Sequence, residues 1–184
     1  MRQLAPLLAA AVLVAGCGGG PPGQQPSEQQ PSEQQPAGQA DRDFVAHMLV
    51  HHSRALELGT LGEQRGSDAR VRAFGARIVR EQTPEEQHLS SWSDSLHLAP
   101  ASGAMAAGYV DDGSLAALQL RTGTAFDRQV LLLSASSEEG AVAMAREELA
   151  GGRYAAARQL ATAISGAPTE EIPSLRALAA ALPG

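Results

Sequence analysis

The residues of this chain that are best suited to chemistry are its histidines, and all five lie between residues 47 and 97. His47 and His51 are four positions apart, as are Met48 and His52, so on a helix the members of each pair share one face. Imidazole nitrogen and thioether sulfur form a soft-to-borderline ligand set, which suits Cu(I) or Cu(II) better than magnesium or calcium. Zinc could use the histidines alone. The spacing predicts a metal site, and the alternative is a polar helix face with two partly exposed histidines.

A second helix is expected to bring further ligands to the same place. The turn between the two helices falls near residues 67 and 68, and His88 lies about as far after it as His47 lies before it, roughly 30 Å along a straight helix. The candidate metal site therefore comprises Met48, His51, His52, His47, His88 and Glu85. Glu85 and His88 form a Glu-x-x-His motif, but a di-iron carboxylate site needs two such motifs, and the matching segment 171–174 has no histidine.

The elements that would position these residues are related by an internal repeat. Residues 41–182 match themselves at an offset of 86 without a gap, as in the pairs Asp41 and Asp127, Ala55 and Ala141, Gly66 and Gly152, Arg72 and Arg158, and Ile78 and Ile164. Two copies are too few for a solenoid. The repeat predicts two tandem helical hairpins that close into a four-helix bundle, with repeat one at 41–99, a linker at 100–113 and repeat two at 114–182.

Hydrophobic spacing supports helices throughout this region, so the predicted fold class is all-α. In the first repeat, apolar or imidazole side chains recur every three or four residues, at Phe44, Met48, His51, Ala55 and Leu58. Glycines that follow this stretch should end the helix, and Ser67 or Asp68 should cap the next one. Pro84 should kink or restart the second helix, and Pro168 and Pro173 indicate a second irregular region.

The second repeat provides an internal control on the candidate ligands. At the offset of 86, His51 becomes Ser137 and His52 becomes Glu138, while His47, Met48 and His88 become Leu133, Ser134 and Ser174. Because the second repeat manages without imidazoles, the fold does not require them at these positions. This favours chemistry over packing as the reason for the histidines, and it predicts one site rather than two.

Composition excludes several classes of function. The chain has 184 residues and a formal net charge of -6, which argues against a nucleic-acid-binding protein. Its single cysteine excludes an internal disulfide and a cysteine-based zinc site. The sequence has no nucleophile-elbow context and no glycine-rich phosphate loop between a strand and a helix, so we expect a protein that is not an enzyme.

The first forty residues predict export and anchoring. A short apolar run from Leu4 to Ala15 ends at Gly16-Cys17, which resembles a bacterial lipoprotein signal, so residues 1–16 would be removed and Cys17 would carry the lipid. Residues 17–40, rich in Gln, Pro, Ser and Glu, are expected to form a disordered tether. The predicted location is the cell membrane, lipid-anchored, on the extracytoplasmic or periplasmic side.

With these residues in view, the chain resembles the DUF305 family. The resemblance rests on Asp43-Phe44, on Met48-x-x-His51-His52-x-x-Ala55, on Ile78-x-x-x-Gln82-x-x-Glu85 with Trp92, and on the companion half from Phe126 to Ala145. It covers residues 41–182 and implies a ferritin-like helical fold. Because the family includes copper-binding members, the resemblance also implies copper as the ligand, with Met48, His51 and His52 as the ligand candidates.

The chain departs from the family's pattern at three places. Val50 stands where the family often has Pro, Leu89 stands where it often has Met, and Ser137-Glu138 replaces a second His-His pair. The predicted function is a lipid-anchored protein that binds or sequesters copper outside the cytoplasm. The alternative is a non-catalytic helical envelope protein that docks an unknown protein partner and binds no metal.

Overall fold

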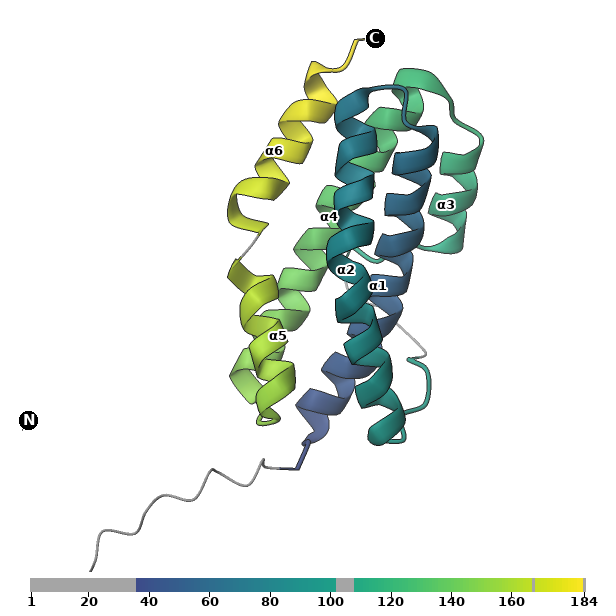
Figure 1. Ribbon diagram of the computed structural model, residues 1–184. Helices are drawn as coiled ribbons and strands as arrows, with labels where there is room; N and C mark the ends of the chain where they lie inside the picture. Colours follow the sequence, from purple (N-terminus) through teal and green to yellow (C-terminus); the bar gives the residue numbers. More distant parts are fainter. Residues whose placement is uncertain (1–35, 102–107, 167, 184) are drawn as a thin grey trace, which may run out of the picture. The chain divides into compact units, whose positions relative to one another are not determined.

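The chain is helical throughout the part that the structure describes. The computed structural model describes residues 36–101, 108–166 and 168–183, and these contain six helices and no strand. The helices are α1 (Gln39–Arg65), α2 (Ala69–Ser95), α3 (Asp112–Gln119), α4 (Gly123–Gly151), α5 (Ala155–Gly166) and α6 (Pro168–Ala181) (Figure 1). The predicted all-α class is therefore confirmed. The lipoprotein signal at 1–16, Cys17 and most of the predicted tether lie outside the described residues.

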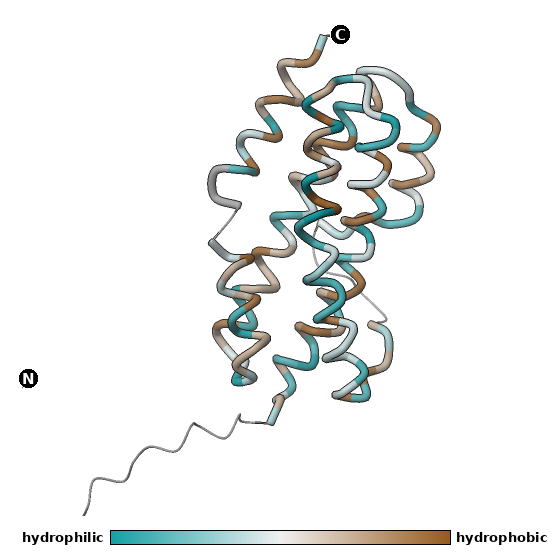
Figure 2. The backbone as a smooth tube through the Cα atoms, in the orientation of Figure 1, coloured by the Kyte–Doolittle hydropathy of each residue, from teal (hydrophilic) through white to brown (hydrophobic). Residues whose placement is uncertain are grey.

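The helices form two hairpins that meet through their first arms. In the first hairpin, α1 packs along α2; in the second, α4 packs along α5 and then α6; and α1 packs against α4. Figure 2 shows hydrophobic and hydrophilic residues alternating along the helices, as expected when each helix turns only one face inward. Among the described residues, no helix is both long and apolar enough to cross a lipid bilayer.

Two apolar clusters make up the core. One lies around Leu58, Phe74, Phe126, Leu131 and Leu175, and draws on both hairpins. The other contains Phe44, Met48, Leu89, Met144 and Ala161. The scarcity of aromatic residues means that both clusters consist largely of aliphatic side chains.

The helix ends follow the local sequence in most places. Helix α1 stops before Gly66, whose N–H bonds to the carbonyl oxygen of Gly62, and Asp68 caps α2 by accepting a hydrogen bond from the N–H of Arg70 at 2.7 Å. Of the predicted kink or restart at Pro84, the restart is wrong, because α2 continues through Pro84 as one helix. In the second hairpin, where Pro168 and Pro173 predicted an irregular region, α5 ends at Gly166, α6 begins at Pro168, and Pro173 lies inside α6.

A buried aspartate in each hairpin accepts hydrogen bonds from the turn of the other hairpin. Asp127 of α4 accepts hydrogen bonds from the N–H groups of Ser67 and Asp68 at 2.9 and 2.8 Å, just before α2 begins. Asp41 of α1 accepts them from the N–H groups of Arg153 and Tyr154, both at 2.8 Å, just before α5 begins. The two sets of contacts are related by the 86-residue offset. Each aspartate thus satisfies backbone donors at the turn of the opposite hairpin.

The backbones of α1 and α2 approach each other closely at Gly75. A Cβ atom at Gly75 would lie 2.4 Å from the backbone oxygen of Gly59 and 2.4 Å from the backbone nitrogen of Glu63, so only glycine fits where α1 and α2 cross. The equivalent position in the second hairpin is Ala161, which is fully buried. The α1–α2 contact holds Glu85 of α2 against the middle of α1.

Candidate metal site

Two adjacent histidines in the middle of α1 are almost completely buried. The exposed fraction is 3% for His51 and 2% for His52. His51 faces α4, where its Nε2–H donates to the backbone carbonyl oxygen of Ser137 at 2.9 Å. The hydroxyl oxygen of Ser137 lies 3.2 Å from the same nitrogen. The carbonyl oxygen can only accept, so the contact fixes the proton of His51 on Nε2.

His52 faces the other arm of its own hairpin. Its Nε2 lies 2.9 Å from a carboxylate oxygen of Glu85, and the side chain of Glu85 is 34% exposed while that of His52 is 3% exposed. Because a carboxylate accepts hydrogen bonds, Nε2 of His52 is the donor. This is the arrangement by which a carboxylate commonly orients a metal-binding imidazole.

The second nitrogen of each ring has no partner. Among the described residues, Nδ1 of His51 and Nδ1 of His52 are both buried without a hydrogen bond. Burial, together with the neighbouring His52, lowers the pKa of His51 to about 4, so its ring is neutral at pH 7 and Nδ1 carries a lone pair. An unsatisfied buried nitrogen is unfavourable. A metal ion at Nδ1 would satisfy it, so the ligand chemistry of the pair fits a bound ion.

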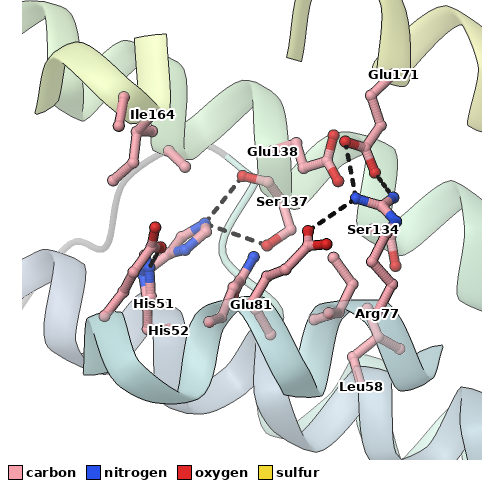
Figure 3. A pocket seen from close by; sticks show the side chains of 16 residues that line it. His51, His52, Leu58, Arg77, Glu81, Ser134, Ser137, Glu138, Ile164 and Glu171 are labelled. Atoms are coloured by element: carbon pink, nitrogen blue, oxygen red, sulfur yellow. Dashed lines mark hydrogen bonds and ion pairs between the residues drawn. The ribbon is translucent and has the colours of Figure 1, made fainter. Parts of the chain in front are cut away.

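Both rings line a partly enclosed cavity of about 200 Å³ between the two hairpins (Figure 3). The wall consists of His51, His52, Ala55, Leu58, Arg77, Ile78, Glu81, Gln82, Glu85, Ser134, Ser137, Glu138, Ala141, Ala163, Ile164 and Glu171. Many of these residues are pairs 86 positions apart, such as His52 with Glu138 and Glu85 with Glu171. The cavity therefore lies where equivalent parts of the two hairpins face each other.

The end of the cavity away from the histidines is acidic. Arg77 forms ion pairs with Glu81, at 3.2 Å, and with Glu171 of α6. Burial raises the pKa of Glu138 to about 7, although the nearby Arg77 opposes the shift. One oxygen of Glu138 is buried without a hydrogen-bond partner among the described residues. One guanidinium therefore faces three carboxyl groups at this end.

The structure places three of the six predicted side chains at the cavity and three elsewhere. His51, His52 and Glu85 line the cavity, and Met48, His47 and His88 do not. Met48 is fully buried in the apolar cluster with Phe44 and Leu89. His47 is bonded through Nδ1 to the carbonyl oxygen of Asp43 at 2.9 Å, and His88 is exposed and stacks on Trp92. The His/Met cluster expected from helical spacing is thus not found among the described residues.

Equal distance from the turn fixes the height of a residue along a hairpin and not the direction of its side chain, which is why His47 and His88 do not reach the cavity. Residues of the second hairpin were missed for a related reason. The partner of His51 is Ser137, exactly the residue that the repeat makes equivalent to it, and an axis relating the two hairpins would bring equivalent residues together. Within the described part of the chain, no three His, Cys, Asp or Glu side chains are arranged to hold one ion. The imidazole pair is therefore the candidate.

Comparisons with known proteins agree with this architecture. Residues 41–179 match the family model DUF305, a domain of unknown function. A DUF305 protein from Streptomyces coelicolor is 24% identical, with a TM-score of 0.70 over 79% of this chain and 95% of that one. A DUF305 fragment from Deinococcus radiodurans is also 24% identical, with a TM-score of 0.69 over 80% and 99%. CopM in its Cu(I)-bound form is 20% identical, with a TM-score of 0.62 over 75% and 94%, and Cu(II)- and Ag-bound forms of CopM also match. At these identities the likeness shows the fold, and no curated protein sequence matches the chain.

Proposed function

Because the chain belongs to the DUF305 family, we propose that it binds a metal ion, with copper as the first candidate, at the imidazole pair of His51 and His52. The observation that carries the proposal is the state of the two rings. Each is buried, each has its Nε2–H held by an acceptor, each has a buried Nδ1 with no hydrogen-bond partner among the described residues, and both residues line the cavity. The Cu- and Ag-bound structures of CopM, which shares the fold, support this choice.

In this proposal the residues around the pair position it and do not coordinate. The carboxylate of Glu85 and the carbonyl oxygen of Ser137 hold the two Nε2 protons, which orients the rings and leaves Nδ1 as the ligand atom. Because burial lowers the pKa of His51, its neutral ring can bind an ion without first losing a proton at neutral pH. The function we propose is binding and sequestration, without catalysis.

The proposal extends to location. Cys17 would be lipidated after removal of residues 1–16, and residues 17–40 would tether the helical domain on the extracytoplasmic or periplasmic side of the membrane. Labelling cells with a radioactive or clickable fatty acid tests this directly. Parent protein should carry the label and remain with membranes, whereas Cys17→Ser should carry none. A label that persists in Cys17→Ser would contradict the assignment.

Metal binding is tested by chelator competition on the full chain with Cu(II) and Cu(I). The informative variant is His51→Ala/His52→Ala, and the matched control is His47→Ala/His88→Ala, which also removes two imidazoles but leaves the cavity intact. We expect close to one ion per chain in the parent and in the control, and loss of that ion in the informative variant. Equal binding by the two double variants would sink the proposed site.

A further inference from the structure

Two buried carboxyl groups meet where the turn of the second hairpin packs on the start of α1. Asp41 of α1 is 0% exposed, and Glu148, near the end of α4, is 1% exposed. Their side chains are in hydrogen-bonding contact. Apart from that contact, neither carboxyl oxygen of Glu148 has a hydrogen-bond partner among the described residues. Because two carboxylates that touch away from water repel each other strongly, the pair is stable when it holds one proton.

The hydrogen bonds around the pair place that proton on Glu148. Burial alone would raise the pKa of Asp41, but three backbone N–H groups donate to its carboxylate and lower that pKa. They belong to Gly38, Arg153 and Tyr154. Burial, followed by the contact with Asp41, raises the pKa of Glu148 to about 7. Protonated Glu148 is therefore the donor, and ionised Asp41 is the acceptor.

The carboxyl group of Glu148 lies directly against the turn that Asp41 bonds. A Cβ atom added to Gly152 would overlap it. On the α5 side, the charged group that faces Glu148 is Arg158, whose guanidinium opposes the rise of the pKa. The same guanidinium donates to the carbonyl oxygens of Leu149 and Gly152, both at 2.9 Å. Loss of the proton from Glu148 thus puts a second negative charge beside the carboxylate that bonds the turn.

The first hairpin provides a matched turn without this group. There Asp127 accepts hydrogen bonds from the N–H groups of Ser67 and Asp68, as Asp41 does at the second turn. The residue equivalent to Glu148 is Gly62, which has no side chain to ionise. The chain therefore contains two turns bonded in the same way, and only one of them has a glutamate packed against its aspartate.

We propose that the proton shared by Glu148 and Asp41 is a pH-sensitive switch: when Glu148 loses it, the turn between α4 and α5 opens locally, while the turn of the first hairpin stays closed. The start of α1 is affected too, because the guanidinium of Arg153 in that turn donates to the carbonyl oxygen of Pro36 at 3.0 Å. Opening thus loosens the junction between the predicted tether and the helical domain. The switch is separate from the proposed metal site.

The direction of the pH dependence follows from the two states of Glu148. In the open turn its carboxyl group meets water and has the ordinary pKa of 4.5, whereas in the closed turn the pKa is about 7. Opening therefore releases a proton between these values, so it becomes more favourable as the pH rises from 4.5 to 7 and then levels off.

Hydrogen exchange of single backbone amides, followed by NMR on the full chain without metal, tests the switch. Exchange is expressed as a protection factor, which corrects for the intrinsic effect of pH on exchange. The amides of Arg153 and Tyr154 report on the proposed switch, and those of Ser67 and Asp68 are the matched control within the same molecule. Between pH 5 and pH 7, we expect protection to fall roughly tenfold or more at the first pair and less than about threefold at the second.

Two variants assign the effect to one carboxyl group. Glu148→Gln keeps the shape of the side chain and cannot ionise, so protection at Arg153 and Tyr154 should no longer depend on pH. Glu147→Gln, at the exposed neighbouring position, should behave like the parent. If Glu148→Gln does not fold, the comparison of the two turns in the parent decides.

Three results would overturn the switch. Protection at Arg153 and Tyr154 could stay constant with pH, it could fall in parallel at both turns, as in opening of the whole domain, or its pH dependence could persist in Glu148→Gln. None of these results bears on the metal site, which chelator competition tests by itself.

Discussion

The two hairpins place different chemistry at equivalent positions of one cavity. In the first, position 52 is a histidine whose Nε2–H is held by Glu85 at 2.9 Å. In the second, the equivalent positions are Glu138 and Glu171, so an imidazole next to a carboxylate is replaced by two carboxyl groups. Arg77, which reaches across from the first hairpin to pair with Glu171, compensates part of that charge, and burial raises the pKa of Glu138 to about 7.

This difference distinguishes the contacts that both hairpins make from the side chains that only one hairpin contains. Asp41 and Asp127 make the same contacts in both directions, and Ala55, Ile78 and their equivalents Ala141 and Ile164 line the cavity on both sides. The imidazoles occur on one side alone. The aspartate contacts, present in both hairpins, should therefore govern stability, and the histidine pair, present in one hairpin, should govern metal binding. Four predictions test these similarities and differences between the hairpins.

The largest expected effect is the loss of either aspartate. Asp41→Ala and Asp127→Ala each remove a buried carboxylate that accepts hydrogen bonds from two backbone N–H groups at the opposite turn, so each should lower the free energy of unfolding by roughly 3 kcal/mol or more. Urea denaturation followed by circular dichroism measures both. Asp43→Ala, which removes an exposed aspartate from the same helix turn as Asp41, should change stability little. A large loss from only one of the two buried aspartates would break the equivalence.

Substitutions at the point where the two arms of each hairpin meet should destabilise the protein unequally in the two hairpins. Gly75→Ala forces a methyl group to within 2.4 Å of the α1 backbone and should destabilise the protein by about 1–3 kcal/mol, despite the better helix propensity of alanine. Ala161→Gly, the reverse change at the equivalent position, should lose only about 1 kcal/mol. Thermal denaturation of the two variants gives the comparison. Similar losses would mean that the two crossings are equally close.

A smaller and pH-dependent difference is expected at Glu148, whose equivalent in the first hairpin is Gly62. Glu148 is 1% exposed beside the buried Asp41, and burial, followed by its contact with Asp41, raises its pKa to about 7. The unfolded chain loses this proton near pH 4.5 and the folded chain near pH 7, so the contribution of Glu148 to stability falls as pH rises through that window.

Glu148→Gln removes this titration and keeps the shape of the side chain. Its melting temperature relative to the parent should therefore rise progressively between pH 4.5 and 7.5. Differential scanning fluorimetry across that range measures the change, and Glu147→Gln, at an exposed neighbouring position, is the control. A difference that stays constant with pH would show that Glu148 does not titrate in this window.

The smallest effects concern the two acceptors that hold the rings. Glu85→Gln replaces the charged acceptor of His52 and should weaken metal binding about tenfold, with little change in stability. Ser137→Ala should leave metal affinity nearly unchanged, because His51 bonds to the backbone carbonyl oxygen of Ser137, which the substitution retains. Chelator competition resolves both. A larger loss in Ser137→Ala than in Glu85→Gln would reverse the roles that the geometry gives them.

The fold class was predictable because helical spacing and the glycine and aspartate signals around residues 66–68 are local. Pro84 was expected to kink or restart the second helix, but α2 continues through it and packs on α1, so local propensity did not predict where this helix ends. Tertiary packing, which no local pattern contains, decided that point.

The candidate site was predictable only in part. His51, His52 and Glu85 lie together, and helical spacing with the hairpin register accounts for them. Met48 shares their helix and their spacing, yet its side chain turns into the core, because an apolar side chain gains more from burial than from a place beside the cavity. Glu138 and Glu171 line the cavity because the second hairpin packs on the first, which spacing within a single hairpin cannot indicate.

The exchanged aspartates also bear on how such a chain could arise. A single hairpin cannot satisfy the backbone donors at its own turn with its own aspartate, since each aspartate serves the turn of the other hairpin. In a protein with one copy alone, these backbone donors would find their acceptor only in a symmetric dimer, where the aspartate of each subunit bonds to the turn of the other. Fusing two copies through a linker replaces a concentration-dependent encounter with an intramolecular one. It also frees the two copies to diverge, so that one can carry a histidine pair while the other serves as its wall.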